Sequence, residues 1–335
     1  MGKVAIDPQV WQPPPAPELA GVFARNDLLD RVELWPTPGA GPEDVVVDHA
    51  GGVVTGLEDG RVVRFDPEGS GPVQLTHTGG RPLGIELLGD DAVLVCDAER
   101  GLLRVGLEDG ACDVLLDRVD RRPLVLTNNA AVGADGTVWF TESTRRHPLS
   151  RFRADILEHN GSGRLLRFDP VTGDVEEVLG GLSFANGVAL AADGQSLVVA
   201  ETGGYALHRV WLHGDRAGER EAFASNLPGF PDNLSTGSDG TIWCALPSLG
   251  QPALDALLPW PPALRKAVWR LPEAIQPDAV RVGFVVGFAP DGTVRHNLRS
   301  DGERFHYVTG VREHDGWLYL GSLVERAVAR VRVPG

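Results

Sequence analysis

The sequence predicts an all-β fold, a six-bladed β-propeller with four-stranded blades, and three observations support this prediction. Asp-Gly dipeptides repeatedly separate short apolar runs, which is typical of β-hairpins. A unit consisting of a polar residue, a strand, a Gly-containing turn and a second strand recurs along the chain. Where nothing is inserted, the copies follow one another at about 40 to 50 residues, the usual length of one propeller blade.

Six copies of this unit can be aligned on their first residues, which are Glu43, Leu83, Asn128, Asn186, Asp232 and Thr309. The copies that begin at Leu83 and Thr309 are the weaker ones. Third strands follow several hairpins, for example at residues 60–66 and 163–169. The last copy has room for about three strands before the chain ends, since each blade needs four. We therefore expect residues 29–35 to supply the missing strand and to close the ring.

The same alignment predicts the domain organisation. Residues 1–28 read as a proline-rich N-terminal arm, and residues 29–335 as a single propeller domain, because closed β architectures often exceed the usual length of one domain. Two insertions, at residues 144–162 and 247–278, lengthen the spacing between blades, and we expect both to lie over one mouth of the channel. The second is apolar and predicts a hydrophobic lid over the substrate, with a membrane-touching helix as the alternative.

Composition excludes several classes of function. The 335 residues carry a net charge of −15, which disfavours binding to nucleic acid or to anionic membranes. The three cysteines have neither metal-ligand spacing nor the even number of a disulfide framework. The N-terminal residues lack the continuous apolar run of a signal peptide, and no segment has the about 20 apolar residues of a membrane helix. These features predict a cytoplasmic protein. The sequence does not indicate an oligomeric state.

The first residues of the repeats predict a metal site. Equivalent positions at the start of each inner strand surround the channel axis, so Glu43, Asn128, Asn186 and Asp232 would direct side-chain oxygens at one point. Two carboxylates and two amides are the hard oxygen ligands that Ca²⁺ prefers, with Mg²⁺ or another divalent cation as the weaker choice. The alternative is structural, because Asn and Asp at strand starts commonly cap turns.

Four segments resemble the strictosidine-synthase-like proteins, which belong with gluconolactonases, paraoxonases and related calcium-dependent phosphotriesterases. They read Leu-Thr-Asn-Asn-Ala-Ala-Val at 126–132, Phe-Ala-Asn-Gly-Val-Ala-Leu at 184–190, Val-Ala-Glu-Thr at 199–202, and Leu-Pro-Gly-Phe-Pro-Asp-Asn-Leu at 227–234. The resemblance implies a six-bladed propeller with a catalytic Ca²⁺ in its channel. It also implies that Glu43, Asn128, Asn186 and Asp232 hold the ion, while Asn129 and Asn233 line the site without binding it.

One departure from that family bears on the chemistry. True strictosidine synthases use a glutamate of the last blade as acid and base, and here Thr309 stands at that position. A threonine hydroxyl does not titrate near neutral pH and cannot replace this carboxylate. The resemblance therefore implies hydrolysis of lactones or aryl esters, with Ca²⁺ polarising the carbonyl of a small-molecule substrate.

Two residues are the candidates for catalysis. Asp232 would act as nucleophile or as the base that orients water, as its equivalent is thought to do in related propellers. His147 titrates in the range needed of a general base, but it stands beside Arg145 and Arg146 in an insertion, which favours a solvated loop histidine. Two other functions stay open: a Ca²⁺-assisted lyase or cyclase, and a non-catalytic propeller that binds a small molecule.

Overall fold

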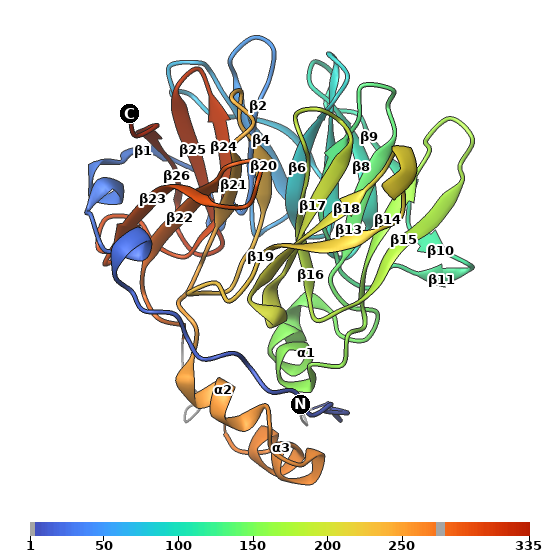
Figure 1. Cartoon of the computed structure of the whole chain (residues 1–335). Coiled ribbons are helices and arrows are strands. Elements are labelled where there is room, and N and C mark those ends of the chain that lie inside the picture. Colours follow the sequence, from blue (N-terminus) through green and yellow to red (C-terminus); the bar gives the residue numbers. More distant parts are fainter. Residues whose placement is uncertain (1–3, 273–278) are drawn as a thin grey trace.

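The computed structural model describes residues 4–272 and 279–335, and these residues form a ring of six antiparallel four-stranded sheets (Figure 1). The predicted fold class is confirmed. Each sheet is one blade, and its first strand is the innermost. A short β10–β11 hairpin (Arg118–Val119 and Arg122–Pro123) extends from the second blade.

Blades 1 to 3 use consecutive strands. Blade 1 contains β2 (Val45–Val47), β3 (Val53–Gly56), β4 (Arg61–Phe65) and β5 (Val73–His77). Blade 2 contains β6 (Pro82–Leu88), β7 (Ala92–Asp97), β8 (Gly101–Gly106) and β9 (Cys112–Leu116). Blade 3 contains β12 (Thr127–Val132), β13 (Val138–Glu142), β14 (Gly163–Phe168) and β15 (Val175–Leu182).

Blades 4 and 5 follow the same order, and blade 6 combines both ends of the domain. Blade 4 contains β16 (Ala185–Leu190), β17 (Ser196–Glu201), β18 (Ala206–Trp211) and β19 (Arg220–Ala224). Blade 5 contains β20 (Leu234–Thr236), β21 (Ile242–Ala245), β22 (Gly283–Phe288) and β23 (Val294–Ser300). Blade 6 contains β24 (Val308–His314), β25 (Trp317–Ser322), β26 (Ala327–Arg332) and, as its outer strand, β1 (Glu33–Pro36).

The blades pack together because their inner and middle strands are apolar on both faces, as expected for sheets covered on each side. Between blades 1 and 2, for example, Val46 and Val54 pack with Ile85 and Val93, and all four are almost fully buried. Similar clusters fill the spaces between the other blades. The hydrophobic core therefore forms a ring around the channel instead of one central mass.

The ring closes through β1, which pairs antiparallel with β26, so that Trp35 lies opposite Val328. The predicted N-terminal closing strand is thus present, but it begins later than residue 29. Residues Leu28–Arg31 form a 3₁₀ turn instead, because Leu29 is buried in the cluster between blades 5 and 6. The strand follows from Glu33 onward.

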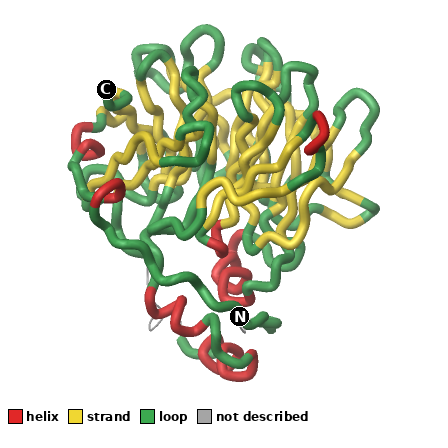
Figure 2. The backbone as a smooth tube through the Cα atoms, in the orientation of Figure 1, coloured by secondary structure: helices red, strands yellow, loops and turns green. Residues whose placement is uncertain are grey.

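The helices of the two insertions gather on one face of the ring (Figures 1 and 2). The first insertion contains a 3₁₀ turn, Leu149–Arg151, and α1 (Phe152–Glu158). The second contains α2 (Pro252–Leu257) and α3 (Pro262–Trp269); its residues 273–278 lie outside the described residues. Three more 3₁₀ turns occur at Gly21–Phe23, Thr202–Gly204 and Gly214–Arg216. In the described part of the chain, no helix combines the length and the apolar character needed to cross a membrane.

Candidate functional site

All six first residues of the repeats line one cavity of about 220 Å³ at the helical face of the channel. These residues are Glu43, Leu83, Asn128, Asn186, Asp232 and Thr309. The four predicted metal ligands therefore meet in space, although they are far apart in the sequence. The other two positions, one apolar and one a hydroxyl, complete the circle.

Interruptions of the sheet register coincide with these positions. The pairing of inner and second strands breaks at residues 83–84 in β6, 128–129 in β12, 186–187 in β16 and 309 in β24. Such a bulge bends the strand and redirects a side chain that would otherwise alternate between the faces of the sheet. The local irregularity thus accounts for side chains directed along the channel instead of toward the neighbouring blades.

The two amide ligands have their nitrogen atoms occupied and their oxygen atoms free. Asn128 Nδ2 donates to Ser143 Oγ at 3.0 Å, and Asn186 Nδ2 donates to Thr202 Oγ1 at 3.1 Å. The Oδ1 atoms of both amides are buried and find no hydrogen-bond partner among the described residues. A buried acceptor in this state costs about 1–3 kcal/mol, which a bound cation would offset.

Glu43 presents the same asymmetry. Its Oε1 accepts a hydrogen bond from Asn233 Nδ2 at 3.1 Å, whereas the buried Oε2 has no partner within residues 4–272 and 279–335. Three blades therefore each direct one unpartnered oxygen at the cavity, from Glu43, Asn128 and Asn186. This is the arrangement expected of a cation site whose ligands are already oriented.

The two carboxyl groups at the cavity are held in an environment that opposes their charges. Burial raises the pKa of Glu43 well above its usual value, and the nearby charge of Asp232 raises it further. Burial likewise raises the pKa of Asp232 to about 8, with a smaller contribution from the charge of Asp44, although the Asn186 amide opposes this change. A divalent cation between them would favour the ionised forms of both.

A second circle of polar residues supports the first. Asp44, Asn129 and Asn233 each directly follow one of the ligands Glu43, Asn128 and Asp232. Asn129 Nδ2 donates to Asp44 Oδ2 at 3.2 Å, and Asn129 Oδ1 accepts a hydrogen bond from the backbone of blade 4 at 3.0 Å. Asn129 and Asn233 were expected to line the site, but neither is among the residues that line the cavity. They orient neighbouring side chains instead. Asp44 was not among the residues predicted from the sequence, although it occupies the same position in its repeat as Asn129 and Asn233 do in theirs.

Glycine occupies the equivalent position in the other three blades, at Gly84, Gly187 and Gly310. A Cβ atom at Gly187 would lie 2.3 Å from the backbone nitrogen of Leu234, and one at Gly310 would lie 2.7 Å from Asp44 Cα. These distances are far below van der Waals contact. The inner strands can therefore approach the axis closely only because polar residues and glycines alternate around the ring.

The cavity wall is mostly apolar and comes largely from the insertions. Leu83 and Phe184 form one cluster with Phe152 and Ile156 of α1. Residues from α2 and α3 complete the wall, namely Leu254, Leu257, Val268 and Trp269. An apolar chamber above a polar floor suits an organic substrate with one polar reacting group.

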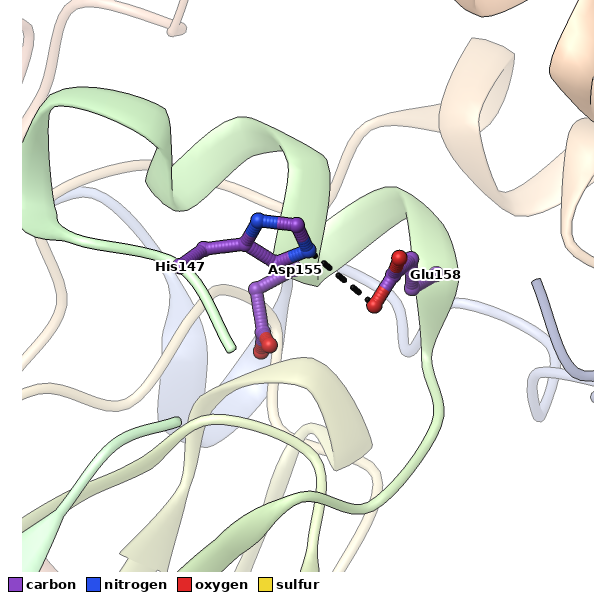
Figure 3. A group of neighbouring side chains, drawn as sticks. All are labelled: His147, Asp155 and Glu158. Carbon is purple, nitrogen blue, oxygen red and sulfur yellow. Dashed lines mark ion pairs between the residues drawn. The ribbon is translucent and has the colours of Figure 1, made fainter. Parts of the chain in front are cut away.

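His147 lies outside this cavity, and it is not a solvated loop histidine. It is only 2 % exposed, because residues 144–162 pack against the ring, and its Nε2 lies 3.1 Å from Glu158 Oε2 (Figure 3). The preference for a solvated position is therefore wrong. His147 is also not among the residues that line the cavity with Asp232.

His147, Asp155 and Glu158 could by distance alone form a second metal site, since their ligand atoms lie within 4.8 Å of one another (Figure 3). The carboxylate of Glu158 already accepts hydrogen bonds, however, from Arg146 Nε at 3.0 Å and from Asn160 Nδ2 at 2.6 Å. The guanidinium supplies the positive charge that a buried carboxylate requires. We therefore interpret this group as an attachment point of the insertion.

The N-terminal residues contact both insertions. The backbone nitrogen of Asp7 donates to Glu158 Oε1 at 2.7 Å, and Trp269 Nε1 donates to the carbonyl of Val4 at 2.8 Å. Trp11 stacks on His159 with ring centroids 4.1 Å apart, and burial lowers the pKa of His159 to about 4. The arm thus contacts both α1 and α3, and Figure 1 shows it passing beside these helices.

Comparisons with known proteins agree with the sequence motifs. The family model described as strictosidine synthase matches residues 128–215, and the model for the N-terminal part of strictosidine synthase-like proteins matches residues 21–65. The adipocyte plasma membrane-associated protein of Rattus norvegicus is 32 % identical over 97 % of this chain and 92 % of its own. A strictosidine synthase-like protein of Arabidopsis thaliana is 31 % identical over 91 % of this chain and 90 % of its own.

Solved structures show the same fold at lower identity. A gluconolactonase from Xanthomonas campestris superposes with a TM-score of 0.67 at 18 % identity, covering 99 % of this chain and 98 % of the other. The calcium-binding protein regucalcin from Agrobacterium tumefaciens superposes with a TM-score of 0.62 at 14 % identity, covering 88 % and 90 %. At these identities the likeness establishes the fold only.

Proposed function

Because the chain belongs to the strictosidine synthase-like family, we propose that it uses that family's channel site as a calcium-dependent hydrolase of lactones or aryl esters. The observation that supports this most is the meeting of three buried, unpartnered oxygens beside the carboxyl group of Asp232. Similarity in fold to a gluconolactonase and to a calcium-binding protein adds to it. The cytoplasmic location stays a prediction, since the name of one relative associates it with the plasma membrane.

The residues at the cavity floor fit a calcium ion. Glu43, Asn128, Asn186 and Asp232 would hold it, and their oxygens are the hard donors that calcium accepts in flexible geometry. The second circle of hydrogen bonds keeps these side chains oriented before binding. A bound calcium ion would supply electrophilic activation of the substrate carbonyl.

The chain's own residues would perform the remaining tasks. The apolar wall binds the organic part of the substrate, and the helices α2 and α3, which form part of this wall, limit the access of bulk water. Asp232 either takes a proton from the attacking water or attacks the carbonyl itself. His147 takes no part in this scheme, because it is not among the residues that line the cavity and its Nε2 lies 3.1 Å from Glu158 Oε2.

Thr309 argues against condensation chemistry of the strictosidine type. Its hydroxyl donates a hydrogen bond to the carbonyl of Glu43 at 2.7 Å, so its proton is already engaged in joining blades 6 and 1. A residue in this role neither titrates near neutral pH nor exchanges protons with a substrate. Hydrolysis, which needs only water and a polarised carbonyl, is compatible with the groups present.

The test is a panel of γ- and δ-lactones and phenyl acetate, assayed with calcium and with a chelator. We expect turnover that the chelator abolishes and that Asp232→Ala removes. Asp239→Ala, at an exposed turn of the same blade, serves as the matched control and should retain activity. Turnover that survives complete metal removal would contradict the proposal. Calcium retention without turnover of any substrate would instead support a binding protein or a different reaction.

A further inference from the structure

Four hydroxyl groups line the cavity, and three of them have their protons engaged. Thr202, Ser248 and Thr309 donate to backbone carbonyls at 2.7, 3.1 and 2.7 Å, those of Pro231, Leu249 and Glu43. The fourth belongs to Tyr307, and its hydroxyl has no hydrogen bond to any described residue of the chain. Tyr307 is therefore the cavity hydroxyl available to a ligand.

The backbone holds Tyr307 in a conformation that few residues adopt. Its φ of 52° lies in the left-handed region, which costs a non-glycine residue of the order of 1–2 kcal/mol. Tyr307 precedes the first residue of its repeat by two positions. Phe184, with a φ of 64°, and Gly41, with a φ of 66°, occupy the same position in their repeats. Both aromatic side chains line the cavity. Strain retained at such positions commonly accompanies function.

Tyr307 lies on the polar side of the cavity. Its blade stands between those of Asp232 and Glu43. Burial raises the pKa of the Tyr307 phenol, the charge of Asp232 raises it further, and the charge of Arg153, which also lines the cavity, opposes this change. The phenol therefore keeps its proton at neutral pH and acts as a donor. The apolar cluster around Leu83 and Phe152 forms another part of the cavity wall. A substrate whose organic part contacts that cluster and whose carbonyl lies at the polar floor would have the Tyr307 hydroxyl in the same chamber.

We propose that Tyr307 is a catalytic residue whose hydroxyl donates a hydrogen bond to the leaving oxygen of the ester or lactone. This inference rests on the proposed hydrolysis. When the scissile C–O bond breaks, its electron pair moves to the leaving oxygen; water adds its hydroxyl group to the acyl carbon and its remaining proton completes the alcohol. The hydrogen bond stabilises the charge that develops on the leaving oxygen.

The test compares Tyr307→Phe with the wild type on two kinds of substrate, since this change removes only the hydroxyl group. The leaving oxygen of an aliphatic δ-lactone becomes an alkoxide, which needs the hydrogen-bond donor. The kcat for this substrate should therefore fall about 100-fold, as it does in other enzymes that lose a donor to a developing negative charge. The leaving group of a nitrophenyl ester is a nitrophenolate, which is stable without the donor. The kcat for this substrate should therefore fall less than about threefold. Tyr205→Phe, whose hydroxyl donates to Asp255 outside the cavity lining, is the matched control and should leave the ratio unchanged.

Two further measurements keep the outcomes distinct. Thermal unfolding and calcium affinity of Tyr307→Phe should match the wild type, because the phenol is not one of the four cavity-floor ligands. Equal losses on both substrates, or no loss on either, would overturn the role of Tyr307 while leaving the hydrolase intact. Absence of turnover in the wild type on both substrates would overturn the proposed hydrolysis, and this inference with it.

Discussion

Asn233 donates a hydrogen bond from its side-chain amide to Glu43 Oε1 at 3.1 Å, joining blade 5 to blade 1 across the channel. The contact holds the carboxylate so that its other oxygen, Oε2, faces the cavity without a partner. A residue that lies beside the cavity thus determines how a residue on the cavity floor can bind an ion.

Removal of this amide should weaken calcium binding without unfolding the protein. In Asn233→Ala, the Glu43 carboxylate is free to rotate, and we expect the dissociation constant for calcium to rise about 10-fold or more, as for other outer contacts of metal ligands. Titration calorimetry measures this directly. Asn226→Ala, which removes a surface amide bonded to Pro15, should leave the affinity unchanged. An unaltered affinity in Asn233→Ala would contradict the orienting role.

The stability of the metal-free protein should depend on pH through Asp232. Its pKa is about 8 in the folded protein against 3.8 normally, so the folded state binds more protons between these values. The free energy of unfolding should therefore fall as pH rises through this window, by at most about 1.4 kcal/mol per pH unit for one group.

Denaturant unfolding in the presence of a chelator at about pH 5 and about pH 8 tests this prediction. Asp232→Asn should reduce the slope. Glu43, Asp44 and Asp155, whose pKa values are also raised, contribute to what remains, whereas His159, whose pKa is lowered, opposes it. Asp239→Asn should not reduce the slope: burial opposes the change, but the hydrogen bonds that Asp239 accepts from Thr241 and the charge of Arg295 together lower the pKa of Asp239. Saturating calcium should abolish the fall, because the bound ion favours the ionised carboxylates. An equal slope in Asp232→Asn and in the wild type under chelation would refute the assignment.

Gly187→Ala should be severely destabilising. Its Cβ would lie 2.3 Å from the backbone nitrogen of Leu234 and 2.5 Å from the carbonyl oxygen of Asp232, and neither backbone group can move aside cheaply. We expect a loss of about 3 kcal/mol or more, at the upper end of the range for single substitutions.

Gly194→Ala is the matched comparison for this prediction. Gly194 has a φ of 68° but no atom within 4 Å of its Cβ position, so only backbone strain of about 1 kcal/mol opposes alanine there. Thermal unfolding of both variants separates close packing from conformational strain. Equal losses in the two variants would show that the close approach of the strands matters little.

Glu158 should control the attachment of the N-terminal arm to the first insertion. Its side chain accepts hydrogen bonds from Arg146, Asn160 and the backbone of Asp7, and it is fully buried. Glu158→Ala would leave these donors without a partner, and limited proteolysis should then cut the N-terminal arm at least several-fold faster. Glu177→Ala, which removes a half-exposed partner of Arg164, should leave the rate near that of the wild type. An arm equally resistant in both variants would contradict the attachment role.

Much of the architecture could be predicted from the repeat alone. The Asp-Gly turns and the apolar strands between them recur often enough to indicate six blades, and the shortage of strands at the C-terminus indicates closure by an N-terminal strand. The start of that strand could not be predicted, because Leu29 packs into a cluster formed by residues distant in the sequence. The environment of His147 was inaccessible for the same reason, since its partner Glu158 reaches it only through the fold of the insertion.

By itself, the sequence determined which side chains surround the channel axis, because equivalent positions in a repeat occupy equivalent positions around the ring. Only the tertiary structure decided which polar atoms remain available there. The Asn186 amide nitrogen, one Glu43 oxygen and the Thr309 hydroxyl find their partners in segments that are distant in the sequence, a turn of the same blade or another blade. Whether a polar atom has a hydrogen-bond partner depends on distances between residues in the folded ring, and the order of residues in the sequence does not give these distances.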